Sequence, residues 1–478
     1  MSSFSRGFLG CIAICLCLVG LPATTPVASE QQPPLAEWTV LVFMNGDNNL
    51  EEDALINFQQ IAAIGSTALV NVLVQLDRNG NYAFTQPQWT QTLRFRVTKD
   101  MAPLPKNALQ DLGEVNMGDP AALSDFVQWG KSAYPAKRYM LVIWDHGQGW
   151  RVFNTAFLQR HRELVASRAY IPKGDVKSLR AQAVLLRNGI GVATTAGRTA
   201  PFRSAPGAAY RSISHDETNN DVLYGREVQD SLTTTLMGEK LDVIGFDACL
   251  MAMLETAYSV RNVARYMVGS EELEPGLGWK YDQWLEQLIN KPTMDGRELG
   301  QVLVNTYAIF WSKVANPPEL TTTLSAIDLS QIPDLATAMS ALSNQLTAKI
   351  DQELQNVISA RKSILNYAPG RSFFHVDLQH FLQHLSAHSS DKQLLAQIAA
   401  TSSIYERAII ANYAGALRAG GGFGSNGMAI YFPASNTEYV TDPYAEGGYE
   451  KTNTYFPVEF VSNESWTDFL HEYWKRVP

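Results

Sequence analysis

The sequence predicts an α/β fold in which a mainly parallel β-sheet carries helices on both faces, followed by a mainly helical C-terminal region. Short apolar runs alternate with stretches of helical apolar spacing, a pattern typical of parallel sheets. The apolar runs also end abruptly in polar residues, and reactive groups gather at the carboxyl ends of parallel strands. With 478 residues, the chain is long enough for two or three domains.

Four apolar runs are interpreted as buried strands and three intervening segments as helices. The expected strands are 38–45, 68–75, 139–144 and 241–246, and the expected helices are 50–63, 121–132 and 228–237. Asn48 and Asn49 are expected to cap the first helix, and the acidic residues that follow them favour its first turn.

Helical patterns dominate beyond about Thr293. Helices are expected over 335–365, 376–385 and 394–417, and strands over 320–328 and 427–432. We therefore expect an α/β domain over 38–292 and a mainly helical region with a few strands over 293–478.

Composition excludes two classes of protein. A net charge of −9 and a sequence pI near 5.5 provide no basic surface for phosphates, so a nucleic-acid partner is not expected. The chain is 46% hydrophobic and only 18% charged, which argues against general disorder.

The first 29 residues resemble a secretory signal peptide. Arg6 supplies the positive charge, and the uncharged apolar run 7–21 is too short for a convincing membrane span. Residues 30–37 are expected to form a linker. An uncleaved anchor is the competing interpretation. With the leader removed, no stable membrane span is expected, and the protein would be periplasmic or extracellular.

The cysteine count points to one residue. Three of the four cysteines lie in the leader, so Cys249 is the remaining thiol of the mature chain and has no cysteine of the same chain to pair with. In an oxidising compartment such a thiol is either buried and inert or chemically used.

Two of the predicted strands end in reactive residues. The run YMLVIWDHGQGW places His146 and Gly147 past the end of one strand, and LDVIGFDACLMAM places Asp247 and Cys249 at the end of another. In a parallel sheet both ends lie at one edge, so the imidazole could activate the thiol. The Gly147 amide could donate to an oxyanion.

These segments resemble the clostripain family of cysteine peptidases, within the caspase, legumain and gingipain group. The similar blocks run in order from WTVLVFMNGDNNLEED through YMLVIWDHGQGW, SHDETNNDVLYGREV and LDVIGFDACLMAMLETAY to YMVGSEELEPGLGWKYDQWL. The resemblance implies a caspase-like α/β/α sandwich, with His146 as general base and Cys249 as nucleophile of an endopeptidase that forms a thioester acyl-enzyme.

The resemblance also implies a specificity residue. Characterised relatives prefer Arg or Lys before the cleaved bond, and their acidic specificity residue lies two before the nucleophile, which here is Asp247. A carboxylate there would pair with a guanidinium of a peptide or protein substrate. The competing interpretation is that Asp247 caps a helix starting near Cys249.

Residues 151–211 form a basic insertion with nine arginines, two lysines and a net charge of +9. Its Ala, Gly, Ser and Thr content predicts an exposed, mobile segment. Because relatives are often matured by cleavage after basic residues, we expect a zymogen that processes itself within this loop; a solvated insertion or an anion-binding surface are the alternatives.

Two other functions keep the same residues: an acyl-transfer enzyme (transpeptidase or ligase) with the same dyad, and a catalytically silent binding protein on this scaffold. No cofactor is required for the chemistry and no metal ligand is predicted. Some relatives need calcium, so a calcium site is compatible with the resemblance. Asp47, Asn49, Glu51 and Asp53 alternate like calcium-loop ligands but lack the required Gly and Glu, and a helix N-terminus explains them. The sequence leaves the oligomeric state open.

Overall fold

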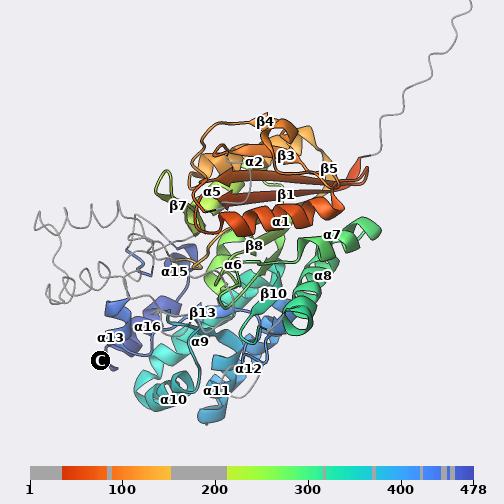
Figure 1. Cartoon of the computed structure of the whole chain (residues 1–478). Helices are drawn as coiled ribbons and strands as arrows, with labels where there is room; N and C mark the ends of the chain where they lie inside the picture. The colour runs from red at the N-terminus through yellow and green to blue at the C-terminus, as the bar shows by residue number, and fades with distance from the viewer. Residues whose placement is uncertain are drawn as a thin grey trace, which may run out of the picture. The chain divides into compact units, whose positions relative to one another are not determined.

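A large mixed β-sheet organises the computed structural model (Figure 1). The structure describes residues 35–82, 89–151, 213–315, 319–368, 373–419, 424–442, 449–452 and 458–477. The predicted signal peptide, most of the linker and all of the basic insertion except Arg151 lie outside these ranges, so the predictions made for them stay predictions.

The sheet has nine described strands, and its five central members are parallel. The flanking strands β12, β10, β3 and β4 pair antiparallel. In spatial order the strands are β12 (Ile409–Ala414), β10 (Thr323–Asp328), β9 (Ala264–Gly269), β8 (Leu241–Asp247), β5 (Ala136–Trp144), β1 (Ala36–Gly46), β2 (Val70–Arg78), β3 (Leu93–Arg96) and β4 (Gln110–Asp111).

Alternating side chains of the central strands enter two separate hydrophobic cores. In β1, for example, Val40 and Val42 face one core, whereas Leu41 and Phe43 face the other. Both faces are therefore buried, which explains why these strands are almost continuously apolar.

Helices cover both faces, as predicted; α1 and α2 lie on opposite sides of β1 in Figure 1. The first core receives side chains from α1 (Glu51–Ile64), α7 (Tyr281–Asn290) and α8 (Gly296–Ile309). The second core receives them from α2 (Pro120–Ala133), α5 (Gly225–Leu236) and α6 (Leu254–Val260). The expected α/β/α sandwich is confirmed.

The C-terminal part is mainly helical and continues the second core. It contains α9 (Ile332–Ala348), α10 (Ile350–Lys362), α11 (Leu378–His388), α12 (Lys392–Ala408), α13 (Asn436–Thr441), α15 (Glu459–Asn463) and α16 (Trp466–Trp474). A two-stranded sheet pairs β11 (His375–Asp377) with β13 (Ala429–Tyr431), and a hairpin pairs β6 (Ile213–Asp216) with β7 (Asp221–Leu223). Short helical turns occupy Pro105–Asn107, Phe310–Val314 and Leu329–Gln331.

Three boundaries differ from the sequence prediction. The expected helix 335–365 is divided at Lys349 into α9 and α10, and 376–385 begins with strand β11. The end of the expected helix 394–417 is instead strand β12, because β10 offers a sheet edge with which Ile409–Ala414 pairs. The proposed division at residue 292/293 stays a prediction, although β10 and β12 hydrogen-bond within the same sheet as β9.

Arg151, the first arginine of the predicted mobile insertion, is buried. Its guanidinium forms an ion pair with Asp442 and lies 4.2 Å from the centre of the Phe373 ring. The prediction that much of the insertion is exposed therefore does not extend to this first residue. Among the described helices, none has both the length and the hydrophobicity needed to cross a membrane.

The packing of α1 against the sheet gives a stability test. Phe58 is fully buried and meets the Phe95 ring edge-on, with the ring centres 5.0 Å apart. Phe58→Ala leaves a cavity and is expected to lower the free energy of unfolding by about 3–5 kcal/mol. Urea denaturation measures this loss. Met237→Ala, at an 88% exposed side chain, is the control and is expected to change stability by less than about 0.5 kcal/mol.

Candidate active site

The pairing of β5 with β8 brings the two predicted catalytic segments to one edge of the sheet. The strands are parallel neighbours, and Trp144 stands opposite Asp247 in their register. His146 and Cys249 each follow two residues later. The predicted convergence of these two chain segments, 103 residues apart in sequence, is therefore present in the structure.

Gly147 packs directly against the chain that carries Cys249. A Cβ atom at this position would overlap the carbonyl oxygen of Cys249 and come within 2.9 Å of the Ala248 side chain. A glycine is therefore required for the His146 segment to approach the Cys249 backbone this closely.

Cys249 is half-buried, and its sulfur lies beside the chain at Glu274. The backbone N–H of Glu274 donates to Sγ at 3.2 Å. Hydrogen bonds to sulfur stabilise the thiolate, the form that reacts with carbonyl groups. Sγ also lies 3.7 Å from the Glu274 carbonyl oxygen, to which the protonated thiol can donate, so the Glu274 backbone accommodates both the thiol and the thiolate.

The imidazole of His146 is half-buried, and its Nε2 lies 3.2 Å from Oδ1 of Asn49. Asn49 was expected to cap α1, but it instead contacts this ring, and Asn48 Oδ1 accepts from the N–H of Leu50 at the helix start. Asp145, beside His146, accepts hydrogen bonds from Asn48 and from the backbone N–H of His215. These contacts join the loop after β1 to the histidine segment.

Asp247 is buried and does not cap a helix. The nearest following helix, α6, begins at Leu254 after the N-cap Met253. The Asp247 carboxylate instead accepts a hydrogen bond of 2.8 Å from the Tyr281 hydroxyl and a longer one from the N–H of Trp279. The helix-cap interpretation is therefore wrong, and the carboxylate instead faces Tyr281, Trp279 and Glu274.

A second carboxylate, Glu274, completes an acidic pair with Asp247. Both of its oxygens are buried, and its polar neighbours are the Asp247 carboxyl group and the Trp279 side chain. Burial raises the pKa of Asp247 to about 7. Burial, and then the negative charges of Asp247 and Cys249, hold the pKa of Glu274 well above its usual range. The pair therefore retains a proton near neutral pH.

Sequence reasoning missed Glu274, although a signal was present. The acidic run EELE follows strand β9, the parallel neighbour of β8, just as Asp247 ends β8. Carboxylates past two neighbouring parallel strands are expected to lie together. The buried hydroxyl of Tyr307, whose pKa is raised by burial and by the charges of Glu274 and Asp247, lies in the same region.

One other group of acidic side chains has the spacing of metal ligands among the described residues: Asp47, Asp77, Glu114 and Asp216. It contains none of the predicted catalytic or specificity residues, and sequence analysis assigned Asp47 only to a helix start. The predicted site residues themselves do not form such a group in the described part of the structure.

A thiol and an imidazole at adjacent carboxyl ends of parallel strands, within an α/β/α sandwich, define the class of caspase-like cysteine peptidases. Comparison with known proteins agrees with this class. The model of the clostripain family matches residues 42–162 and 202–474. The chain belongs to the clostripain family. The unmatched residues 163–201 lie inside the basic insertion.

Individual relatives are distant. Clostripain of Hathewaya histolytica is 23% identical over 273 residues, which are 52% of this chain and only 42% of that protein. A secreted C11 cysteine protease from Bacteroides thetaiotaomicron, solved with an irreversible peptide inhibitor, aligns with a TM-score of 0.53 and 20% identity over 83% of this chain and 93% of the other. An inactive zymogen C11 protease from Parabacteroides distasonis aligns with a TM-score of 0.54 and 19% sequence identity. The alignment covers 84% of this chain and 93% of the other. These two structures share the fold.

The buried acidic pair predicts a stability cost. Because the folded-state pKa of Asp247 is about 7 and its ordinary value is 3.8, folding takes up a proton between these pH values. Stability is therefore lost as pH rises through this window. Asp247→Asn removes this cost. At pH 8 the variant is expected to have a free energy of unfolding about 1–3 kcal/mol higher than the wild type, measured by urea denaturation, and at pH 4.5 the difference is expected to be smaller.

The matched control is Asp100→Asn, at an exposed aspartate whose left-handed backbone Asn also tolerates. Its stability difference from the wild type is expected to be small. A variant Asp247→Asn that is destabilised equally at both pH values would contradict the raised pKa.

Proposed function

We propose that the protein is an exported cysteine endopeptidase that hydrolyses peptide bonds after Arg, and less readily after Lys, with Cys249 as nucleophile and His146 as general base. The observation that supports it most is the packing of Gly147 on the Cys249 backbone, which sets the histidine segment beside the thiol. Family membership supports the same chemistry.

In the proposed mechanism, His146 accepts the thiol proton as Cys249 Sγ attacks the carbonyl carbon of the scissile bond. The tetrahedral intermediate collapses, the C–N bond breaks, and the imidazolium returns its proton to the leaving amine. A thioester acyl-enzyme remains. His146 then removes a proton from water, the hydroxide attacks the thioester, and the thiol is regenerated with release of the acid product.

The immediate surroundings support each role. The N–H of Glu274, at 3.2 Å from Sγ, stabilises sulfur as a thiolate, and Asn49 orients the ring through Nε2. The backbone N–H of Gly147, placed next to Cys249, is our candidate donor to the negatively charged oxygen of the intermediate.

The acidic pair supports the proposed Arg specificity. Asp247 and Glu274 lie next to the nucleophile, and no cationic side chain forms an ion pair with either one among the described residues. A substrate guanidinium would supply the missing positive charge and lower both pKa values, so its binding would release the shared proton. The stability cost of the pair is then offset when substrate binds.

The specificity prediction uses peptides that carry Arg or its neutral isostere citrulline before the scissile bond. Asp247→Asn is expected to lower kcat/KM for the Arg peptide about 10²-fold and to leave the citrulline peptide nearly unchanged, because a buried charge partner is worth roughly 3 kcal/mol. For the wild type, the KM ratio of Arg to citrulline peptide is expected to fall as pH rises through about 7. Fluorogenic assays measure both.

The controls separate specificity from catalysis. Cys249→Ala is expected to lower kcat/KM for both peptides at least about 10³-fold, because removal of a nucleophile abolishes the covalent route. Equal cleavage of both peptides by the wild type would rule out the role of the acidic pair. Ligation products formed with added amines would favour acyl transfer, and failure of a thiol-reactive peptide to label Cys249 would favour a silent binding protein.

We also propose export through the leader and self-processing within 151–211. Two observations support self-processing. The insertion is strongly basic, and its central part, residues 163–201, is not matched by the family model. The secreted C11 protease of Bacteroides thetaiotaomicron and the inactive zymogen of Parabacteroides distasonis, which share the fold, are consistent with both proposals.

Self-processing makes a direct prediction. Purified wild-type protein is expected to convert into two fragments cut after arginines between 152 and 211, whereas Cys249→Ala is expected to stay whole. Gel electrophoresis and mass spectrometry of the new termini follow the conversion. Identical fragments from both proteins would show that another protease made the cut.

A further inference from the structure

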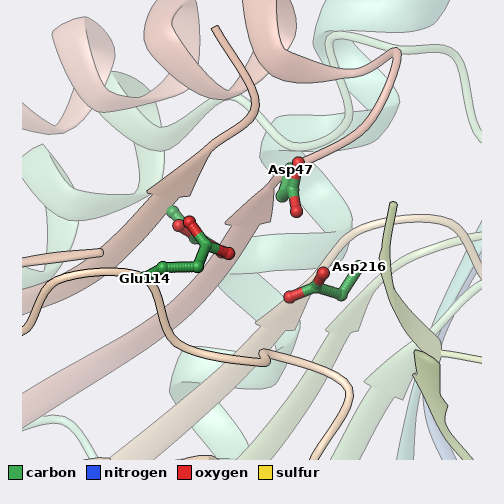
Figure 2. A group of neighbouring side chains, drawn as sticks. Asp47, Glu114 and Asp216 are labelled. Carbon is green, nitrogen blue, oxygen red and sulfur yellow. The ribbon is translucent and has the colours of Figure 1, made fainter. Parts of the chain in front are cut away.

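Four carboxylates from separate parts of the chain meet beside the carboxyl end of β1. One ligand oxygen from each of Asp47, Asp77, Glu114 and Asp216 lies within 4.8 Å of the others. Figure 2 shows the carboxylates of Asp47, Glu114 and Asp216 around a common centre. Asp47 follows β1, Asp77 belongs to β2, Glu114 follows β4, and Asp216 ends β6.

Burial makes this grouping unfavourable without a cation. Asp47, Asp77 and Asp216 are fully buried, and Glu114 forms the exposed side. None of the four forms an ion pair with a described residue; the neighbouring guanidinium of Arg78 pairs instead with Glu51 at 2.8 Å. Buried carboxylates are found paired with cations or coordinating metals, because unpaired burial is costly.

The hydrogen bonding of Asp77 is a second, independent observation that points to a cation. Its Oδ1 accepts hydrogen bonds of 2.9 Å from the Thr92 hydroxyl and from the N–H of Arg78. Its Oδ2 is buried and has no hydrogen-bond partner among the residues that the structure describes. Oδ2 of Asp77 is therefore a buried carboxylate oxygen that could bind a cation.

Among the described residues, no cationic group donates a hydrogen bond to the other three carboxylates, and the side chains of Asp47 and Asp216 lie within hydrogen-bonding range of each other. Asp47 accepts from the Asn79 amide and, at 2.9 Å, from the N–H of Thr218. Asp216 accepts from the N–H of Met117 at 2.8 Å and from Asn219, and Glu114 accepts from the Asn219 amide at 3.3 Å. Neutral donors orient these oxygens without compensating their charge, as the outer shell of a metal site does.

We propose that these four carboxylates bind one Ca²⁺ ion. The donor set consists of oxygen alone, which suits a hard cation, and it offers no thiolate or imidazole for a softer metal. Ca²⁺ takes six to eight oxygens in flexible geometry, so four carboxylates and water on the exposed Glu114 side would satisfy it. Mg²⁺ needs near-ideal octahedral geometry and retains its waters, which a buried group of four carboxylates accommodates less well.

The site would connect segments that precede and follow the basic insertion. Three ligands come before residue 151, and Asp216 comes after residue 211. The hairpin that begins with β6 is further tied to the loop after β1, because the N–H of Glu217 donates to the Asp47 carbonyl at 2.9 Å. A bound ion would therefore hold the two sides of the insertion together.

The same ion would position the proposed catalytic base. Asn48 donates to Asp145 and to the His215 carbonyl, both at 2.9 Å, and Asn49 contacts the His146 ring. These two residues directly follow the ligand Asp47, and His215 directly precedes the ligand Asp216. This positioning effect depends on the proposed peptidase function, whereas ion binding does not.

The binding test uses the full chain carrying Cys249→Ala, so that proteolysis does not interfere. After chelation with EDTA and buffer exchange, calorimetric titration with CaCl2 is expected to give one ion per chain. Thermal unfolding is expected to shift upward by about 3 °C or more with saturating Ca²⁺. The same concentration of Mg²⁺ is expected to give a smaller shift.

Two variants identify the site. Glu114→Gln, at an exposed position, is expected to fold normally and to weaken Ca²⁺ binding at least about tenfold. Asp77→Asn is expected to melt no lower than the parent in EDTA, because it relieves repulsion, yet to lose the calcium-dependent shift. Asp111→Asn, at an exposed carboxylate of β4 outside the group, is the control and is expected to keep the full shift.

The proposal is overturned if the Cys249→Ala chain shows neither binding heat nor a thermal shift with Ca²⁺, if both variants keep the full shift, or if Mg²⁺ produces an equal shift. Peptide hydrolysis by the corresponding variants with intact Cys249 is a separate readout. Calcium binding together with an inactive wild type would refute the peptidase proposal and leave the ion site in place.

Discussion

The parallel pairing of β5 with β8 is the constraint on which the active-site geometry depends. Their register places Trp144 opposite Asp247, so the segments that carry His146 and Cys249 both begin at the same edge of the sheet. Gly147 then packs directly on the Cys249 carbonyl group, so the two segments are in direct contact. Because both strands are buried on both faces, a one-residue slip would move every side chain into the opposite core, where it does not fit the packed neighbours, and this favours the observed alignment.

The acidic pair near Cys249 illustrates a conflict between stability and function. Isolated from solvent, Asp247 and Glu274 hold a proton that they would lose in the unfolded chain, so their burial destabilises the fold at neutral and higher pH. A cationic substrate side chain would reverse this cost, since it favours both charged forms. The strongly perturbed carboxyl groups near Cys249 thus support the proposed role of this pair in substrate recognition.

The loop after β1 links the two candidate sites. Within three consecutive residues, Asp47 contributes to the carboxylate group, Asn48 bonds to Asp145 and His215, and Asn49 contacts His146. The hairpin of β6 and β7 meets this loop from the far side of the insertion. His146, the proposed general base, is thus tied through this loop to the segment that follows the insertion.

Local sequence patterns were enough to predict four of the five parallel strands, the carboxyl-end positions of His146 and Cys249, and the family, because buried parallel strands and their polar ends leave a local signature; β9 was not predicted. It did not determine the carboxylate group or the partner of Asp247. Asp47, Asp77, Glu114 and Asp216 are up to 169 residues apart and have no common spacing, so only chain packing brings them together. Likewise, aspartate is favoured at helix N-caps, so the local sequence allowed a cap at Asp247. In the structure its carboxylate instead accepts hydrogen bonds from Tyr281 and Trp279. The strand at Ile409–Ala414 follows the same principle, since the edge of β10 overrides its helical pattern.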